Sequence, residues 1–184
     1  MTSTLRTDAR RNRERIVAAA RRCFAEHGLE VGVDEIARQA GVGMGTLYRR
    51  FPTKTSLIHA IFEQSLDELQ PAIDRALAAD DPWEGFVELL LAGVAQQARD
   101  HGFGQMVVLR LGPEAVPEDT RRRFLAPLGE LLARAQAAGT VRRDITAGDV
   151  PAIVRMAGAT ALGGDPAPDC RRHAGLLLDG LRAR

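Results

Sequence analysis

The sequence predicts an all-α protein, and three features of its 184 residues support this class. Alanine and leucine are abundant and runs of β-branched residues are scarce, so intrinsic preferences favour helix over strand along most of the chain. Apolar residues recur at the spacing of one helical face. They make up 45% of the chain and charged residues 27%, a balance typical of a globular protein with a buried core.

The first three predicted helices span residues 8–27, 33–40 and 44–51. In the first, Ile16 and Ala20 share one apolar face, and Gly28 should end the helix as a left-handed cap. The second has two acidic residues in its first turn, where the helix dipole favours negative charge, and ends at Gly41. Pro52 stops the third, because proline cannot continue a helix.

The remaining predicted helices span residues 54–69, 82–100, 103–111, 117–138, 147–162 and 169–181. Thr53 and Asp81 are suitable N-caps for the first two of these, and Pro82 suits a first helical turn. Pro71 should kink or end the fourth helix of the chain, although its apolar pattern resumes as far as Leu77.

Charge is distributed unevenly along the chain. Residues 1–60 hold 11 Lys or Arg and 6 Asp or Glu, a net charge of +5, whereas residues 61–184 hold 14 and 18, a net charge of −4. A local basic excess is what binding to nucleic-acid phosphates requires. Any such partner should therefore be bound by the N-terminal part.

Neither the cysteines nor the histidines are spaced as a metal site or a catalytic centre requires. Cys23 and Cys170 lie far apart, and the four histidines form no HxxxH or HExxH pattern. We therefore expect no metal, no cofactor and no enzymatic activity. The charged N-terminus is unlike a signal peptide and no apolar stretch reaches the length of a membrane span, so a cytoplasmic location without membrane contact is expected.

Residues 33–52 have the pattern of a helix-turn-helix, in which one short helix is held steeply against the next. The small Ala37 lies where the helices would cross, and Gly41 can supply the left-handed turn. Ile36 and Leu47 can form a small shared core.

Residues 36–57 read IARQAGVGMGTLYRRFPTKTSL and resemble the N-terminal signature of the TetR family of bacterial regulators. The resemblance covers about the first 60 residues, and the rest of the chain is similar mainly in being helical. It implies an N-terminal three-helix DNA-binding domain over residues 1–55 and a C-terminal helical domain for ligand binding and dimerisation over residues 56–184. The fourth helix belongs to both parts.

The resemblance implies that the DNA-binding residues are Met44, Gly45, Thr46, Tyr48, Arg49, Arg50 and Lys54. Arg49 can bond guanine bidentately, Tyr48 can donate to a phosphate oxygen, and Lys54 stands where the family places a phosphate-binding lysine. Gly32 and Gly43 depart from the family pattern, which commonly has Thr and Ser caps there, so both helices should begin less firmly.

TetR-type regulators enclose an inducer within their C-terminal helices, so the resemblance implies a small, mostly apolar ligand. The apolar candidates for the cavity are Trp83, Phe86, Leu90, Phe103, Met106, Val107, Phe124, Leu128 and Met156, and the polar candidates are Gln97, His101, Arg110 and Arg155. By periodicity alone, apolar residues in this pattern are more often plain core than the lining of a cavity.

The family likeness further implies a homodimer in which the last two helices pack against their symmetry mates. Apolar residues that can supply this surface are Val150, Ile153, Val154, Ala157, Ala161, Leu162, Leu176, Leu177, Leu178 and Leu181. The expected function is a transcriptional repressor that a ligand releases from double-stranded operator DNA. The alternative is a small-molecule carrier that has lost DNA binding. The sequence speaks against this alternative, because the residues of the DNA-binding signature at Leu47, Tyr48 and Lys54 are intact.

Overall fold

The computed structural model describes residues 2–100, 103–158 and 168–183. Within these ranges the chain is helical and has no β-strand, which confirms the predicted all-α class. The elements are α1 (Thr2–His27), α2 (Val33–Ala40), α3 (Met44–Arg50), α4 (Lys54–Ala78), α5 (Pro82–Arg99), α6 (Phe103–Leu111), the short 3₁₀ helix η1 (Pro113–Ala115), α7 (Glu118–Ala137), α8 (Val150–Gly158) and α9 (Pro168–Leu181).

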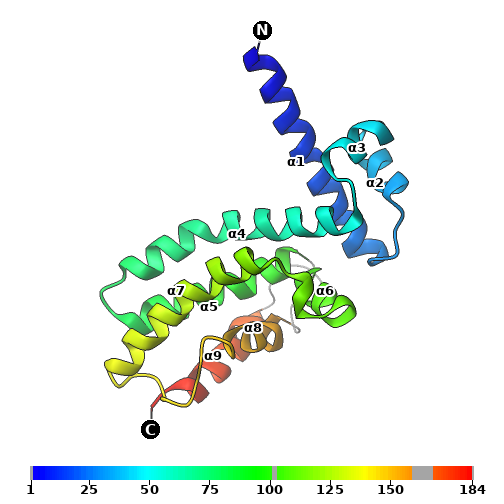
Figure 1. The fold of residues 1–184 in the computed structure, drawn as a ribbon. Helices are drawn as coiled ribbons and strands as arrows, with labels where there is room; N and C mark the ends of the chain where they lie inside the picture. Colours follow the sequence, from blue (N-terminus) through cyan, green and yellow to red (C-terminus); the bar gives the residue numbers. More distant parts are fainter. Residues whose placement is uncertain (1, 101–102, 159–167, 184) are drawn as a thin grey trace.

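The first three helices form a head at one end of α4 (Figure 1). Their shared core contains fully buried Ile16, Phe24, Ile36 and Leu47. The N-terminal half of α1 projects beyond this head (Figure 1). The head therefore has its own apolar core, built from the residues that the helical periodicity places on inward faces.

Both predicted left-handed caps are present, with φ of 74° at Gly28 and 63° at Gly41. At Gly41 the backbone N–H donates to the carbonyls of Ala37 and Arg38, which closes α2 and turns the chain toward α3. Glycine adopts this conformation without the steric cost that a Cβ brings.

The long helix α4 connects the head to the rest of the molecule (Figure 1). Thr53 caps its start: the hydroxyl accepts from the Ser56 backbone N–H at 3.1 Å, and the Ser56 hydroxyl accepts from the Thr53 backbone N–H at 3.3 Å. The sequence predicts a kink or an end at Pro71, but α4 continues through it to Ala78. The proline is exposed while Ile73 beyond it is buried, so packing offsets the lost hydrogen bond.

Below α4, the helices α5, α7, α8 and α9 form a layered C-terminal body (Figure 1). Its core includes Trp83, Phe86, Leu90 and Leu128, all less than 9% exposed. An isolated antiparallel bridge between Val141 and Arg182 ties the last residues to the segment after α7.

Two helix starts differ from the sequence expectation by more than one residue. The first helix begins at Thr2 rather than near residue 8. The eighth begins at Val150 rather than residue 147, because the Asp149 carboxylate accepts from the backbone N–H and the hydroxyl of Thr146 at 2.8 and 2.7 Å and holds that segment as a turn. The expected end of this helix at residue 162 lies outside the described residues.

The apolar residues expected at a dimer surface divide into three groups. The first group is buried within this chain and contains Val150, Ile153, Val154, Ala157, Leu178 and Leu181. Leu176 is 60% exposed and Leu177 is partly buried, whereas Ala161 and Leu162 lie outside the described residues. Most of the expected surface thus packs inside the chain, and the exposed apolar residues on the last two helices include Met156 and Leu176.

Candidate DNA-binding face and ligand cavity

The third helix offers nearly its whole circumference to solvent. Leu47 is its one buried residue, and it anchors the helix to the core of the head. Met44 is 37% exposed and Tyr48 is 47% exposed. A short helix that buries one side chain, half-buries Thr46 and exposes the rest has the form that insertion into a major groove requires.

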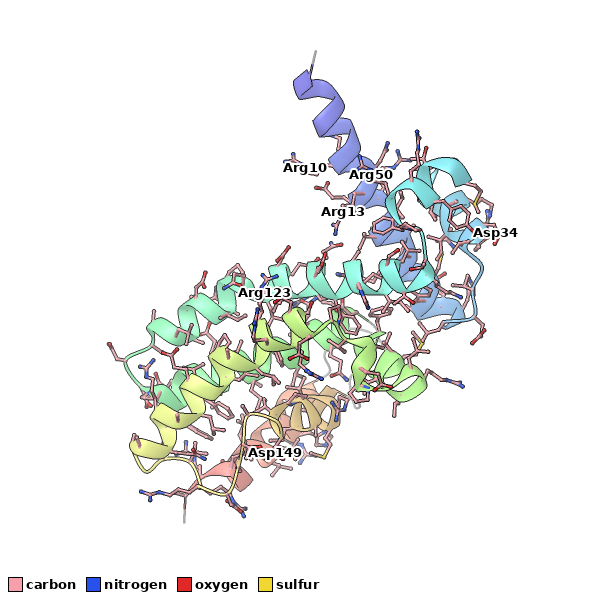
Figure 2. The ribbon with its side chains drawn as sticks, viewed as in Figure 1. Arg10, Arg13, Asp34, Arg50, Arg123 and Asp149 are labelled. Carbon is pink, nitrogen blue, oxygen red and sulfur yellow. The ribbon has the colours of Figure 1, made fainter. Side chains whose placement is uncertain are left out.

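The basic end of α3 is partly preorganised. The Arg49 Nε donates to the Gly45 carbonyl oxygen at 3.2 Å, and its Nη2 donates to the Thr46 hydroxyl at 3.3 Å. These bonds hold the guanidinium along the exposed side of the helix. Arg50, also exposed, is labelled beside the head in Figure 2.

Neither short helix of the head has a side-chain cap, as the sequence predicted. Gly32 precedes α2 and Gly43 precedes α3, and both have extended backbone without a capping side-chain bond. The first backbone N–H groups of α3 therefore have no side-chain acceptor from a capping residue, and such groups attract phosphate oxygens.

Basic residues of α1 and α4 flank the third helix. The Arg15 Nη2 donates to the Ala40 carbonyl at 2.7 Å and holds the turn between α2 and α3. The Arg13 guanidinium lies 6.0 Å from the Phe51 ring centroid and pairs with Glu63 at 3.1 Å. Lys54 begins α4 with its Nζ 6.0 Å from the Phe24 ring centroid. The residues expected to contact DNA therefore lie on one end of the molecule.

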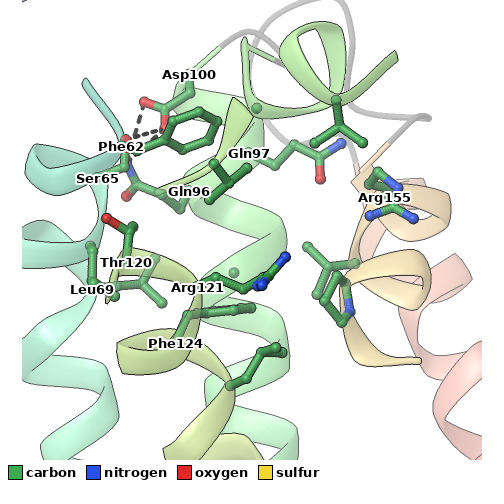
Figure 3. A pocket seen from close by; sticks show the side chains of 18 of the residues that line it. Phe62, Ser65, Leu69, Gln96, Gln97, Asp100, Thr120, Arg121, Phe124 and Arg155 are labelled. Carbon is green, nitrogen blue, oxygen red and sulfur yellow. Dashed lines mark hydrogen bonds between the residues drawn. The ribbon is translucent and has the colours of Figure 1, made fainter. Parts of the chain in front are cut away.

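A cavity of about 520 Å³ lies among α4, α5, α6, α7 and α8 (Figure 3). Its apolar wall contains Phe62, Leu66, Leu69, Phe103, Val108, Val116, Phe124, Leu125 and Val154. Its polar side chains are Ser65, Gln96, Gln97, Asp100, Thr120, Arg121 and Arg155. A mostly apolar pocket of this size with a few polar groups suits a small organic molecule.

Four of the residues expected at the cavity line it: Gln97, Phe103, Phe124 and Arg155. Trp83, Phe86, Leu90 and Leu128 instead lie in the core of the C-terminal body, and Met106 and Val107 pack against the core of the head. Arg110 and Met156 are exposed, and His101 lies outside the described residues.

Sequence reasoning missed the cavity residues of α4 and, beside Phe124 in the N-terminal half of α7, the contributions of Thr120, Arg121 and Leu125. One wall of the cavity is formed by Phe62, Ser65, Leu66 and Leu69 of α4. In the sequence these residues belong only to the apolar pattern or to the polar face of the fourth helix. Their position on the element shared by both predicted domains could have indicated them.

A hydrogen-bonded polar network closes one end of the cavity and reaches the head. Asp100, only 6% exposed, pairs with Arg21 of α1 at 3.0 Å and accepts from the Ser65 hydroxyl at 2.8 Å. Arg21 also pairs with Glu68 at 3.2 Å. Gln96 donates to Glu68 at 2.9 Å and to both oxygens of Asp100. The network joins α1, α4 and α5.

The hydrogen bonds of this network affect the pKa of Glu68. Partial burial raises the pKa of the carboxyl, but the hydrogen bonds donated by Gln96 and Arg21 favour its charged form and together lower the pKa below the ordinary value. Glu68 is therefore held as a carboxylate at neutral pH.

Within the described part of the chain, no helix is long and apolar enough to cross a membrane. The same residues contain no group of three or more His, Cys, Asp or Glu side chains that could hold a metal ion.

Comparison with known proteins gives matches over both parts of the chain. Residues 16–61 match the family of bacterial regulatory proteins named tetR, and residues 81–183 match the C-terminal domain described as transcriptional regulator SbtR-like. An HTH-type transcriptional regulator of Staphylococcus aureus strain USA300 is 42% identical over 64 residues, which are 34% of this chain and 35% of the relative. That match therefore spans about a third of the relative's length.

Two solved structures align over nearly the whole chain. A TetR transcription regulatory protein from Mycobacterium vanbaalenii is 38% identical with a TM-score of 0.63, covering 97% of this chain and 99% of that one. RolR, solved in complex with the ligand resorcinol, is 25% identical with a TM-score of 0.62, covering 97% of this chain and 91% of that one. Family matches to both domains and whole-chain likeness lead to one conclusion: this chain belongs to the TetR family of DNA-binding transcriptional regulators, which are transcription factors rather than enzymes.

Proposed function

We propose that this chain is a repressor that binds operator DNA as a homodimer and leaves it when a small, mostly apolar molecule enters the cavity. The observation that carries the proposal is α3, whose single buried residue, Leu47, leaves Tyr48, Arg49 and Arg50 facing solvent. Bound to DNA upstream of a gene, such a protein blocks access of the transcription machinery. The site of action is the cytoplasm, where bacterial DNA lies.

In this proposal the exposed residues of α3 divide into base-reading and phosphate-binding groups. Arg49 reads a guanine edge through its two guanidinium nitrogens, and Met44 and Thr46 contact bases or sugars at the start of the helix. Tyr48 and Lys54 bind phosphates and fix the register of the helix on the duplex.

Dimerisation supplies the second half-site. The two recognition helices of a dimer must meet major grooves about 34–36 Å apart or close to that spacing. Met156 on α8 and Leu176 on α9 are 55% and 60% exposed, and they support a contact between these two helices and their symmetry mates.

A continuous series of contacts supports coupling between the cavity and the DNA-binding face. Phe103 lines the cavity, and its ring centroid lies 5.8 Å from that of Phe24 in the head. The Nζ of Lys54 lies 6.0 Å from the same Phe24 ring centroid. Phe62 of α4 also lines the cavity and lies 5.5 Å from Phe103, centroid to centroid. A ligand that moves α4 or α6 therefore moves Lys54 and the head.

The solved structure of RolR with resorcinol adds support, because it pairs a small organic ligand with a protein of this fold. A ligand lowers operator affinity only if it binds the DNA-incompetent arrangement more tightly than the competent one. A ligand that binds more tightly when α4 is displaced meets this condition. Displacement of α4 rotates both heads, and small rotations change the spacing of the recognition helices.

The test is run-off transcription in vitro from the promoter upstream of the chain's own coding sequence. We expect the protein to reduce transcript in proportion to promoter occupancy. More transcript on occupied DNA would indicate an activator, and unchanged transcript would contradict a direct regulatory role at this promoter.

A further inference from the structure

The cavity has two chemically different ends. At one end lie Asp100, Ser65 and Gln96, joined by the hydrogen bonds drawn in Figure 3. Away from it, Arg121 of α7 and Arg155 of α8 line the cavity, and Gln97 of α5 lies toward the same side (Figure 3). Aromatic and aliphatic side chains fill the wall between them.

The acidic end is already neutralised. Asp100 pairs with Arg21 at 3.0 Å and accepts from Ser65 at 2.8 Å and from Gln96 at 3.2 Å. Its two oxygens therefore have partners from three helices. A cationic ligand would have to displace Arg21 before it could pair with Asp100, so this end does not favour positive charge.

Among the residues that the structure describes, the basic end is only weakly neutralised. Arg155 is partly buried, and among the residues that the structure describes no carboxylate pairs with it. Arg121 pairs with Glu118 one turn earlier on α7, but the Glu118 side chain is 74% exposed. An ion pair this open to water stabilises little, so a ligand can readily replace Glu118 as the partner of Arg121.

A partly buried guanidinium without a counter-ion favours binding of an anion. Two guanidiniums on one side of an apolar cavity match a carboxylate on an apolar body, since arginine presents several N–H donors to the two oxygens.

We propose that the inducer is an apolar carboxylic acid, bound as its anion. Its carboxylate pairs with Arg155 and Arg121, and its hydrocarbon or aromatic body packs against Phe62, Phe103 and Phe124. This inference rests on the proposed function, because it names the chemical class of the molecule that the cavity senses.

A head-group series tests the proposal without any mutation. Octanoate, octanol and octylammonium share one apolar body, and each is titrated calorimetrically into the full chain in the absence of DNA. We expect octanoate to bind about tenfold or more tightly than octanol, the usual effect of a hydrogen bond to a charged partner. The proposal would be overturned if octylammonium or octanol bound as tightly as octanoate. It would also be overturned if none of the three bound measurably.

Substitutions then locate the carboxylate. Arg155→Gln should weaken octanoate binding about tenfold and leave octanol binding nearly unchanged, and Arg121→Gln should weaken octanoate by about two- to fivefold. The matched control is Arg122→Gln, which removes the same charge from the next residue of α7, where the side chain is 73% exposed and pairs with Asp119. Equal octanoate affinity in wild type and Arg155→Gln would contradict the assignment.

Two measurements keep the result interpretable. Arg155→Lys retains the charge and should retain the preference for octanoate over octanol. This variant separates removal of the charge from damage to the fold. Loss of the preference in an Arg155→Lys protein with wild-type circular dichroism would contradict a charge-based role. Binding of ligand-free protein to its own upstream DNA is measured in parallel. DNA binding without octanoate preference refutes this inference alone, whereas octanoate binding without DNA binding refutes the proposed function alone.

Discussion

Arg49 is the residue on which sequence-specific recognition should depend most. Its guanidinium is held along α3 by Gly45 and Thr46 and is exposed to solvent. We expect Arg49→Ala to relax base preference at one symmetric pair of operator positions, by about 1–3 kcal/mol per bidentate contact. Selection from a randomised-site library measures this. Unchanged preference at every position would remove Arg49 from the base-reading residues.

Lys54 should contribute affinity rather than specificity. It is the only lysine in the sequence and begins α4 next to Phe24. We expect Lys54→Ala to weaken binding to all DNA sequences alike and to reduce the slope of log affinity against log salt by about one for each phosphate that the lysine neutralises. Arg75→Ala is the control, because Arg75 lies near the far end of the same helix and pairs with Glu88. A changed base preference with an unchanged slope would refute the phosphate role.

At the residue scale, the sequence predicted the head far better than the cavity. The residues of α3 are adjacent in sequence and on one short helix, so a local motif fixes which of them face solvent. The cavity residues come from five α-helices and the segments between them, and a buried Phe86 and a cavity-lining Phe124 both occupy apolar positions with helical spacing. Only the packing of the helices distinguishes these two positions.

The turn between α2 and α3 sets the angle of the recognition helix. Gly41 has φ of 63°, and a Cβ there would lie 2.7 Å from the Arg15 Nη2 that holds the turn. We expect Gly41→Ala to lower the free energy of unfolding by about 1–2 kcal/mol from backbone strain alone, and further because Arg15 must move.

Gly28→Ala is the matched control for the Gly41 substitution. Its φ is 74°, but a Cβ there would meet no atom within 4 Å, so it carries the backbone strain alone. Urea unfolding of both variants measures the difference. Equal destabilisation would mean that the Arg15 contact adds nothing to the turn.

The contact between α1, α4 and α5 should depend on pH through Glu68. Its pKa is lowered in the folded chain, so its stabilising contribution is present above its ordinary value of 4.5 and is lost as the pH falls through the lower folded value. The free energy of unfolding should therefore fall more steeply below pH 4.5 in wild type than in Glu68→Gln, which cannot titrate.

The control for this pH dependence is Glu63→Gln. Glu63 lies on α4, as Glu68 does, but it makes an exposed pair with Arg13 of α1, away from the network around Asp100. The pH profile of this variant should follow wild type. An identical profile for Glu68→Gln and wild type would contradict a role for the carboxylate in joining the helices.

At the element scale, helix starts and stops could be predicted where one side chain or glycine decides them, as at Thr53, Asp81 and Gly41. The continuation of α4 through Pro71 could be predicted only in part. The apolar pattern resumes beyond the proline as far as Leu77, but the helix persists there because Ile73 and Ala76 are buried against the C-terminal body, and the local sequence does not show that packing.

Across the whole molecule, the core and the cavity should respond differently to large-to-small changes. Phe86 is fully buried in the C-terminal core, so Phe86→Ala should lower the free energy of unfolding by about 3–5 kcal/mol. Phe124 is only partly buried and faces the cavity, so Phe124→Ala should cost less and mainly change ligand affinity. Thermal unfolding and calorimetric titration compare the two. Greater destabilisation by Phe124→Ala would mean that this wall is core.

DNA binding by the full chain is the most direct test of its role as a regulator. Fluorescence anisotropy at moderate salt compares the DNA upstream of its own coding sequence with a shuffled duplex of equal composition. We expect preferential binding by two chains per site, weakened steeply by salt because the net charge of +5 lies in residues 1–60. Equal, weak affinity for both duplexes by a folded chain that still binds small molecules in its cavity would contradict this role and favour a carrier.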